Sequence, residues 1–318
     1  LEGSAIGRYF PVTLGIQADA KASAEAISAA AGDLGGTAWK DWRDAFQADY
    51  AGLMDERERE ASDRSEPMHP RRALGEIRAA LLDHLVIFFR DQDLPVDRHK
   101  AFTRRFGDIF IHPNYQLGQE DKETVYLLRR PGDTSVAGEN WHADTTMMET
   151  PPMGAILYAL ECPEFGGDTL FANQYMAYDA LSDAMKAMLD GVQAWHSDIR
   201  IAGPQSGVNA KRSSQVRADA DWRPTVNTHP VVQIHPESGR KGLFVNPIYT
   251  THLEGMSEAE SAPVLDFLYR HQCRPEFTCR FRWKQGSIAF WDNRSTVHLA
   301  IHDNHDCVRH MQRTQIAG

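Results

Sequence analysis

The chain has 318 residues, of which 42% are hydrophobic and 25% are charged, so it predicts an ordinary soluble globular protein with a sizeable core. A formal net charge of −10 without a long basic run argues against nucleic acid or an anionic membrane surface as a partner. No stretch approaches the roughly 18 continuous apolar residues of a membrane span, and the sequence does not open with the layout of a signal peptide.

Residues 1–73 differ in composition from the rest of the chain. They are rich in Ala, Asp and Glu and include a charged run over 55–60. We interpret them as a divergent N-terminal segment of strands and helices packed on the core, and residues 74–318 as one further domain.

From residue 74 onwards, hydrophobic periodicity predicts helices and many short strands. Helices are expected over 74–84, over 95–106, from Tyr178 to Met188 and behind a capping box at Ser257–Glu260. Alternation over 278–283 predicts that Cys279 faces inward. The expected strands are 85–89, 154–160, 168–172, 230–234, 242–245, 278–283, 287–291 and 296–301. This order predicts a β-sandwich or jelly-roll core with helices packed outside.

The most informative motif is Trp141-His142-Ala143-Asp144, which has a distant counterpart in His298. In an extended strand, His142 and Asp144 point to one face, so both can reach one metal ion. A jelly roll would bring a strand from the middle of the chain beside one near its end. Two imidazoles and one carboxylate form an iron(II) site that keeps positions open for a cosubstrate and dioxygen. A lone His-x-Asp is a weak signal, and His196-Ser197-Asp198 is interpreted as a chance match.

Two arginines, Arg309 and Arg313, follow His298 at a spacing that suits one face of a helix or of a strand. A guanidinium group binds a carboxylate through two parallel hydrogen bonds. Most arginines are solvated surface charges. Two of them beside a candidate metal site in an acidic protein nevertheless predict an anion pocket.

At these residues the chain resembles the TauD/TfdA family of iron(II)- and 2-oxoglutarate-dependent dioxygenases. The resemblance runs from about Leu81 to the C-terminus. It implies an α+β fold with a double-stranded β-helix (jelly-roll) core and flanking helices, and a dioxygenase domain over 74–318. It also implies Fe(II), 2-oxoglutarate and O2 as cofactor and cosubstrates. The matching blocks are NWHAD at 140–144, TPPMGA at 150–155, GGDT at 166–169, LFVN at 243–246 and WDNR at 291–294.

The resemblance assigns roles to the residues of these blocks. It implies His142, Asp144 and His298 as the catalytic iron ligands. It implies Thr169 and Arg309 as the residues that hold the distal carboxylate of 2-oxoglutarate.

The resemblance also implies a substrate site. Arg313 matches a position next to the cosubstrate that faces the sulfonate of the substrate, and His112 and Tyr115 match sulfonate ligands. Tyr249 stands where taurine dioxygenases have Phe, and Gly138 where they have Asn. These departures, with the unusual residues 1–70, argue against taurine itself as the substrate and leave the iron chemistry intact.

The first functional hypothesis is therefore a hydroxylase of a small anionic substrate, a sulfonate or a sulfate ester, that releases succinate and CO2. The alternative is the same chemistry on an aryloxyalkanoate or a secondary metabolite. A non-catalytic jelly-roll binding protein and a zinc hydrolase are hypotheses from other classes. The four cysteines form no C-x-x-C pair and predict buried free thiols in a reducing cytoplasm. We expect a cytoplasmic homo-oligomer, a dimer or tetramer, with a small-molecule substrate.

Overall fold

Contacts divide the chain into two units, residues 1–75 and 76–318, and the second unit carries the sheets. The predicted N-terminal segment lies mostly outside the described residues and stays a prediction. No helix in the described part of the chain is long and apolar enough to cross a membrane. The computed structural model describes residues 70–113, 120–133, 138–202, 222–303 and 306–318, with isolated positions between 48 and 62.

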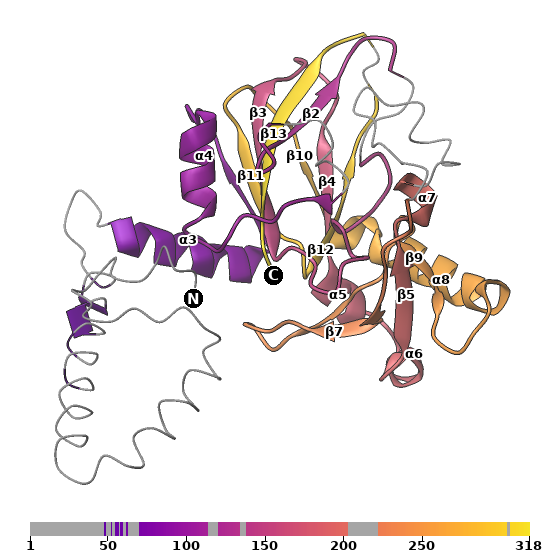
Figure 1. Ribbon diagram of the computed structural model, residues 1–318. Coiled ribbons are helices and arrows are strands. Elements are labelled where there is room, and N and C mark those ends of the chain that lie inside the picture. The colour runs from indigo at the N-terminus through magenta and orange to yellow at the C-terminus, as the bar shows by residue number, and fades with distance from the viewer. Residues whose placement is uncertain are drawn as a thin grey trace. The chain divides into compact units, whose positions relative to one another are not determined.

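The helices of the structure are shown in Figure 1, and the residues at several of their N-termini explain where they begin. α3 begins at Pro70, a residue type that the first helical turn tolerates. The predicted capping box of α8 is confirmed, because the Ser257 hydroxyl accepts from the Glu260 amide at 3.3 Å and the Glu260 carboxylate accepts from the Ser257 amide at 2.9 Å. The helices are α3 (Pro70–His84), α4 (Val96–Thr103), α5 (Gln174–Asp179), α6 (Asp183–Leu189), α7 (Ile199–Ala202), α8 (Glu258–Gln272) and the 3-10 helix η4 (Pro275–Phe277).

The helical pattern expected from Tyr178 to Met188 is divided between α5 and α6. The Ser182 side chain accepts from the Met185 amide at 3.3 Å and so caps a new helix. A serine at this position satisfies a backbone N–H that has no partner inside the helix, which favours a new start over continuation.

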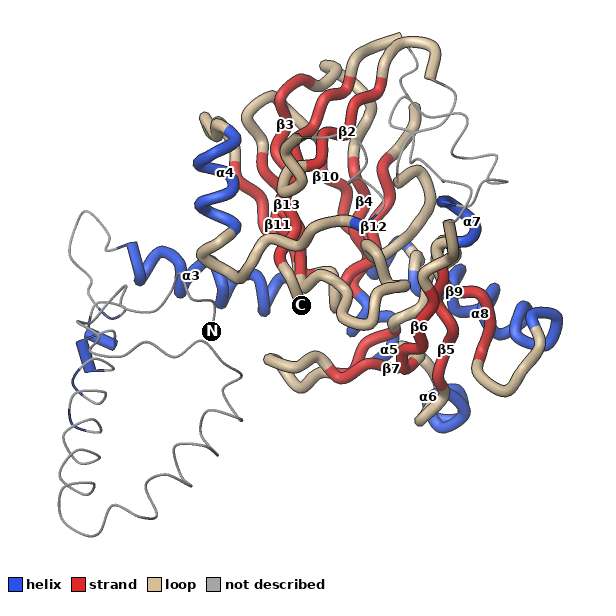
Figure 2. Tube along the Cα trace, viewed as in Figure 1, coloured by secondary structure: helices blue, strands red, loops and turns tan. Residues whose placement is uncertain are grey.

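The strands pair antiparallel throughout the described residues (Figures 1 and 2). Their orders are β1-β11-β3-β13-β2, β10-β4-β12, β6-β5-β9 and β7-β8. The strands are β1 (Val86–Phe89), β2 (Val125–Arg129), β3 (Gly154–Glu161), β4 (Thr169–Asn173), β5 (Gln193–Ser197), β6 (Val226–Pro230), β7 (Val232–Ile234), β8 (Lys241–Leu243), β9 (Thr250–Leu253), β10 (Thr278–Phe281), β11 (Ile288–Asp292), β12 (Thr296–Ala300) and β13 (Arg309–Ile316).

Two details of the predicted strands are wrong. The strand expected over 230–234 is divided, because β6 ends at Pro230, which has no N–H to donate to a ladder. Cys279 is exposed although alternation predicted it to face inward, because only the last residue of β10, Phe281, is buried. The other three cysteines are partly buried, so the prediction of buried thiols is also wrong, while all four are free.

One apolar core lies between the five-stranded sheet and the β10-β4-β12 sheet. Leu157 of β3 faces this core together with Phe171 of β4. The preceding residue of β3, Ile156, points to the opposite face of the sheet, where it packs with Leu81 of α3 and Phe102 of α4. Because both faces of β3 are covered, its sequence is an almost continuous apolar run.

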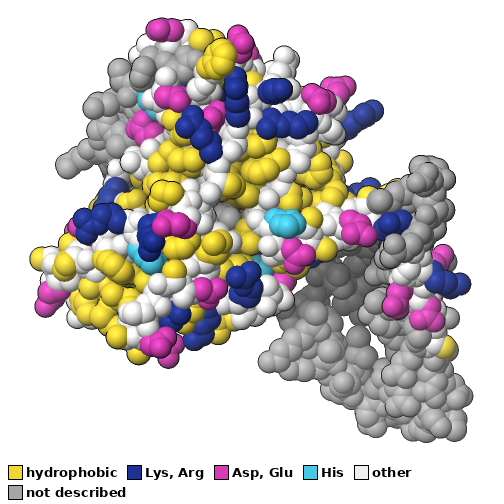
Figure 3. Space-filling view, turned by 180° about the vertical axis from the view of Figure 1, so that it is seen from behind, with side chains coloured by type: hydrophobic (Ala, Val, Ile, Leu, Met, Phe, Trp, Pro, Cys, Tyr) yellow, Lys and Arg dark blue, Asp and Glu magenta, His cyan; other side chains and the backbone are white. Residues whose placement is uncertain are grey.

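A second apolar cluster packs β5, β8 and β9 against the helices α6 and α8. It joins Leu189 of α6, Ala194 of β5, Leu243 of β8 and Leu268 of α8. On the face seen in Figure 3, cationic and anionic side chains of the described residues occur among apolar ones. The charged residues are therefore not segregated on this face.

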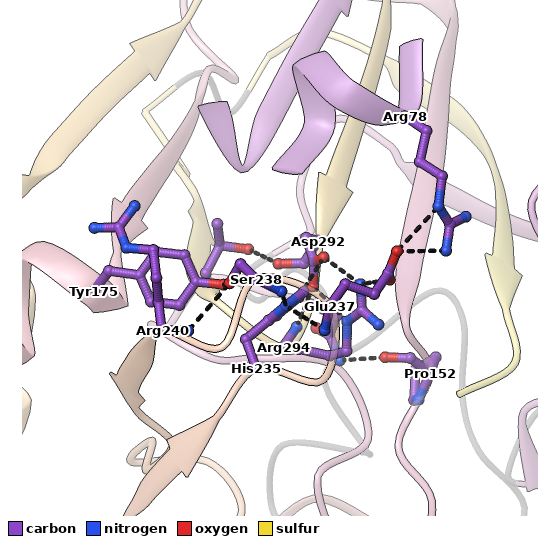
Figure 4. A network of polar contacts seen from close by, with 11 residues as sticks. Arg78, Pro152, Tyr175, His235, Glu237, Ser238, Arg240, Asp292 and Arg294 are labelled. Atoms are coloured by element: carbon purple, nitrogen blue, oxygen red, sulfur yellow. Dashed lines mark hydrogen bonds and ion pairs between the residues drawn. The ribbon is translucent and has the colours of Figure 1, made fainter. Parts of the chain in front are cut away.

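A polar network anchors the turn that joins β11 to β12 (Figure 4). Asp292 is 1% exposed and accepts hydrogen bonds from Arg294 at 2.9 and 2.6 Å and from His235 at 3.0 Å. Arg294 also donates to Glu237 at 2.8 Å, and Glu237 accepts from Arg78 of α3 at 2.6 Å. The network thus connects α3, the β7–β8 hairpin and the turn that leads to His298.

Replacing Asp292 with alanine is expected to destabilise the fold by about 3 kcal/mol, because the buried His235 ring loses its acceptor and the guanidinium of Arg294 keeps only Glu237 as a carboxylate partner. Glu237→Ala is the matched control, and we expect a loss below about 1 kcal/mol since its ion pairs reach the surface. Urea unfolding followed by circular dichroism measures both. Equal losses in the two variants would show that Asp292 is not the centre of the network.

A second buried polar group lies between α4 and β13. His99 is fully buried; its Nδ1 accepts from the Gln312 amide at 2.7 Å and its Nε2 lies 2.9 Å from the Thr314 hydroxyl. Burial lowers the pKa of His99 to about 4, although a hydrogen bond with the Ile156 backbone acts in the opposite direction. Folding therefore favours the neutral ring.

The pH dependence of stability follows from the lowered pKa of His99. The unfolded chain protonates this ring first as the pH falls below about 6.5, so stability is complete above that value and is lost towards about pH 4. The expected share of His99 in the loss is at most about 3 kcal/mol. Urea unfolding at several pH values should show a shallower dependence for His99→Gln. The same dependence in wild type and variant would contradict this assignment.

Candidate metal and cosubstrate site

The two histidines of the predicted ligand set lie on neighbouring backbone segments. His298 is in the middle of β12, and His142 lies beside it in an isolated antiparallel bridge. The His142 amide donates to the His298 carbonyl at 3.0 Å, and the His298 amide donates to the His142 carbonyl at 2.7 Å. The structure therefore brings these distant residues together through one reciprocal pair of hydrogen bonds.

Asp144 is positioned by Asn293 and by a turn. The Asn293 side chain accepts from the Asp144 amide at 2.6 Å and donates to the Asp144 carbonyl at 3.0 Å. The next residue, Thr145, has a φ of +48°, which for a β-branched residue costs about 1–3 kcal/mol of strain. The extended geometry predicted for 142–144 ends before Asp144, because the chain turns there. Tertiary hydrogen bonds hold this strained backbone.

The three predicted ligand side chains converge. Nε2 of His142 is 3.5 Å and Nε2 of His298 is 3.9 Å from Oδ1 of Asp144. One donor atom of each residue lies within 4.8 Å of the others, and all three residues are buried. Nδ1 of His142 donates to the Asn140 carbonyl at 2.8 Å, which leaves a lone pair on Nε2. Within the described residues this is the group that fits a divalent cation taking imidazole and carboxylate ligands.

Arg313 of β13 forms an ion pair with Asp144 and thereby favours the ionised carboxylate. Its Nη1 lies 3.1 Å from Oδ1 and 3.3 Å from Oδ2 of Asp144. Burial alone would raise the pKa of Asp144, but Arg313 and the two histidines hold it well below its usual range. Burial, assisted by His142, lowers the pKa of His298 to about 3. Asp144 is thus ionised and His298 neutral at neutral pH, the states that a metal ligand requires.

The predicted cosubstrate residues Arg309 and Thr169 lie side by side. Nη2 of Arg309 is 3.5 Å from the Thr169 hydroxyl, and Nε donates to the Gly167 carbonyl at 3.0 Å. Trp283 donates to the same hydroxyl at 2.9 Å. Burial, with Arg129 on the facing strand, lowers the pKa of Arg309 to about 10. An anion beside Arg309 would offset the cost of removing its guanidinium from water.

One cavity is lined by both clusters and by Arg313. His112 and Tyr249, two of the predicted substrate residues, also line it. Tyr115 lies outside the described residues, so its predicted role stays a prediction. The apolar part of the lining comes from Leu127, Leu157, Ile201, Ala202, Ile248, Trp291 and Ala300. The cavity therefore combines charged groups with an apolar wall.

Gly138 keeps part of this cavity open beside His142. Its φ is +83°, and a Cβ atom there would lie 3.1 Å from Cε1 of His142. A larger residue would strain the backbone and press on the ligand ring. The glycine noted in the sequence thus widens the space next to the predicted ligand His142.

Sequence reasoning missed two residues that hold Asp144. Asn293 belongs to the WDNR block, but the block alone does not show which backbone its amide contacts. Gln315 donates from Nε2 to Oδ2 of Asp144 at 3.1 Å. The signal that could have found Gln315 is strand alternation, which places it on the same face as Arg313 once 309–316 is known to be a strand.

The second His-x-Asp tripeptide, His196-Ser197-Asp198, makes hydrogen bonds to neighbouring segments. His196 lies in β5, where its ring contacts the Thr146 hydroxyl at 2.8 Å. Asp198 accepts from the Thr225 amide at 2.9 Å. The interpretation of this match as a chance occurrence stays a prediction, and the metal-binding group found among the described residues consists of His142, Asp144 and His298.

Known proteins match most of the chain. The model of the family described as "Taurine catabolism dioxygenase TauD, TfdA family" matches residues 62–315. The chain is 32% identical over 244 residues to an alkylsulfatase of Acinetobacter baylyi, covering 76% of each protein. It is 33% identical over 244 residues to an alpha-ketoglutarate-dependent sulfate ester dioxygenase of Pseudomonas putida, covering 76% of this chain and 80% of that protein. A solved taurine dioxygenase from Burkholderia xenovorans has a TM-score of 0.63 and 33% identity, with 81% and 83% of the chains covered.

The relatives share this region and differ in total length. A Schizosaccharomyces pombe protein that is 34% identical over 243 residues is matched over 73% of this chain and 60% of its own length. The ligand triad, the Arg309–Thr169 pair and the cavity all lie inside the region matched by the family model. The chain therefore belongs to the TauD/TfdA family of alpha-ketoglutarate-dependent dioxygenases, which are oxidoreductases.

Proposed function

We propose that this protein hydroxylates a small anionic substrate, a sulfate ester or a sulfonate, in a reaction that uses iron(II), 2-oxoglutarate and O2. The position of Arg313 carries this proposal, because its guanidinium lines the cavity next to the ligand triad. His112 and Tyr249 line the same cavity and offer an imidazole and a hydroxyl group to an anion. The alkylsulfatase and the sulfate ester dioxygenase among the relatives support this substrate class.

His142, Asp144 and His298 would hold the iron(II) ion. When bound there with 2-oxoglutarate and O2, the ion supplies the oxidising chemistry that yields succinate, CO2 and a hydroxylated substrate carbon. The protein binds and orients the reactants and keeps water away. The three ligand residues are at most 8% exposed, which suits that task.

Arg309 and Thr169 would bind the distal carboxylate of 2-oxoglutarate. The Thr169 oxygen already accepts hydrogen bonds from Trp283 and Arg309, so its own proton is left to donate to a carboxylate. The planar guanidinium of Arg309 provides two further parallel donors. Both partners are buried, where charge-assisted hydrogen bonds are strong.

Arg313 would bind the sulfate or sulfonate group, and the apolar wall would receive the carbon chain. Hydroxylation of the carbon that carries a sulfate ester oxygen gives a product that collapses to an aldehyde and sulfate. An aryloxyalkanoate is the second candidate, since its carboxylate suits Arg313 and its ring suits the apolar wall. A (S)-phenoxypropionate/alpha-ketoglutarate-dioxygenase of Sphingobium herbicidovorans is 30% identical over 261 residues.

We also infer that the two facing sheets form the predicted double-stranded β-helix. β3 pairs with β13, and β4 pairs with β12, so strands from the middle of the chain lie beside strands from its end. Such pairing is typical of a jelly roll. The homodimer or tetramer and the cytoplasmic location stay predictions.

The test starts with an anaerobic titration of the apoprotein with iron(II) and then 2-oxoglutarate, in which we expect a visible charge-transfer band. Succinate release is then measured with alkyl sulfates, alkanesulfonates and phenoxyalkanoates, with the corresponding alcohols as uncharged controls. Stimulation by sulfates or sulfonates but not by alcohols is the expected result. Stimulation by phenoxyalkanoates alone would support the second candidate. Absence of both the band and succinate would indicate a binding protein or a zinc hydrolase.

A further inference from the structure

Gln315 lies in a position from which it can act on the metal site through Asp144. It is on β13, two residues after Arg313, so the two side chains share one face of the strand. It is 2% exposed, and its Nε2 donates to Oδ2 of Asp144 at 3.1 Å. Strand alternation thus directs a buried neutral amide at the carboxylate of the predicted ligand set.

The chemistry of the two groups fixes which end of the amide faces Asp144. Arg313 donates to both carboxylate oxygens of Asp144, with Nη1 at 3.1 Å from Oδ1 and 3.3 Å from Oδ2, so these oxygens act as acceptors. An amide oxygen turned towards it would place two acceptors in contact. The NH2 group must therefore face Oδ2, and Oε1 of Gln315 has no hydrogen-bond partner within the described residues. The hydrogen bond to Asp144 is the one that this side chain makes in that region.

The two donors from β13 differ in what a cation would do to them. The nitrogens of His142 and His298 approach Oδ1 of Asp144, so a cation held by the triad lies on the Oδ1 side. A cation held there would repel the guanidinium of Arg313, whose Nη1 also contacts Oδ1, and an anionic substrate would attract this guanidinium. The neutral amide of Gln315 contacts Oδ2 and is subject to neither effect.

We propose that Gln315 is a positioning residue that holds Oδ2 of Asp144 so that Oδ1 stays directed at the metal when Arg313 turns to the substrate. The inference rests on the metal site of the proposed function and adds a residue to it. Residues that orient a metal ligand in this way typically change metal affinity about 10- to 100-fold when replaced. Gln315 acts through Asp144 and does not itself touch the metal or the substrate.

The chain offers a matched control on the same strand. Gln312 is also buried on β13, at 3% exposure, but its amide contacts His99 and not the metal site. Gln315→Leu and Gln312→Leu each replace a buried amide by a leucine of similar size, so both should lower the melting temperature. Only the first removes a donor from Asp144.

The experiment is a titration of the apoprotein of each variant with Co(II), whose visible absorption reports its coordination, without any substrate or turnover. We expect Gln315→Leu to raise the Kd for Co(II) about 10- to 100-fold. Gln312→Leu should leave this Kd within about twofold of the wild-type value, because its amide contacts His99 and not the residues of the triad. Gln315→Met, which has the same length and no donor, replaces the leucine variant if that one does not fold.

A wild-type Kd in a folded Gln315 variant, or an equal rise in Gln312→Leu, would overturn the proposal. Failure of the proposed function has a different signature. A wild-type protein that binds Co(II) but oxidises no sulfate or sulfonate would contradict the substrate assignment and leave the role of Gln315 standing. A wild-type protein that binds no Co(II) would overturn both.

Discussion

Replacing Asp144 with alanine is expected to reduce succinate formation at least about a thousandfold, the equivalent of about 4 kcal/mol. Asp144 is the one carboxylate of the triad that the described residues bring together. Without it, the two imidazoles lack the negative charge that balances a divalent cation, and metal affinity falls with activity. Succinate release and anaerobic iron(II) binding measure the two effects.

Asp144→Asn is the control that separates loss of the ligand from loss of the fold. With its carbonyl oxygen in the place of Oδ2, asparagine can still accept from Gln315 and from Arg313, whereas its NH2 group replaces Oδ1 and the charge is removed. Alanine leaves Arg313 unpaired and should destabilise the apoprotein by about 3 kcal/mol, whereas asparagine should cost less. Both variants should keep the wild-type circular dichroism spectrum. Turnover in Asp144→Asn within about tenfold of wild type would show that the carboxylate is not a ligand.

Replacing Arg309 with leucine is expected to raise the KM for 2-oxoglutarate about a hundredfold, since a charge-assisted pair contributes about 3 kcal/mol. The distal carboxylate would lose both guanidinium donors, and Thr169 would remain as a single neutral donor. Arg309→Lys keeps the charge without the planar fork and should fall between wild type and the leucine variant. Initial rates at varied 2-oxoglutarate concentrations measure the change.

Two further measurements make the assignment of Arg309 specific. Pyruvate lacks the distal carboxylate, so the preference for 2-oxoglutarate over pyruvate should collapse in Arg309→Leu. Arg129→Leu removes a buried guanidinium that faces Arg309 across the strand pair but does not line the cavity. For this variant we expect the KM for 2-oxoglutarate to change by about fivefold, which corresponds to roughly 1 kcal/mol. An unchanged preference between the two oxoacids in Arg309→Leu would place the carboxylate elsewhere.

The sequence predicts those parts of the fold whose signal is local. β3 and β11 were predictable because each is an apolar run between turn residues. α8 was predictable because Ser257 and Glu260 form a capping box at its N-terminus. β9 is only Thr250–Leu253, a short polar stretch that becomes a strand by pairing with β5. The segment 309–316 fitted either a helix or a strand, because residues i and i+4 share a face in both. Its pairing with β3 and β2 decides for a strand.

The candidate site shows the same division. The triad was predictable, because His142, Asp144 and His298 stand in blocks that are typical of a family. The residues that orient Asp144 were not, since Asn293 and Gln315 are common residue types whose partner is chosen by tertiary contacts about 150 to 170 residues apart in the chain. The contact of Arg313 with Asp144 also depends on the folded arrangement, since the sequence assigned this arginine to bound anions alone.

The reciprocal hydrogen bonds between His142 and His298 have a consequence for the order of folding events. The segment between His142 and His298 must lose conformational entropy before these two residues can form their hydrogen bonds. We therefore expect this non-local pairing to be a slow step of folding. We therefore expect the complete group of His142, Asp144 and His298 to form only when these segments have paired. A metal ion that binds the folded protein alone would stabilise it by mass action, by about 2.7 kcal/mol when free metal is at 100 times its Kd. Chelators should accordingly lower the melting temperature and leave the chain folded.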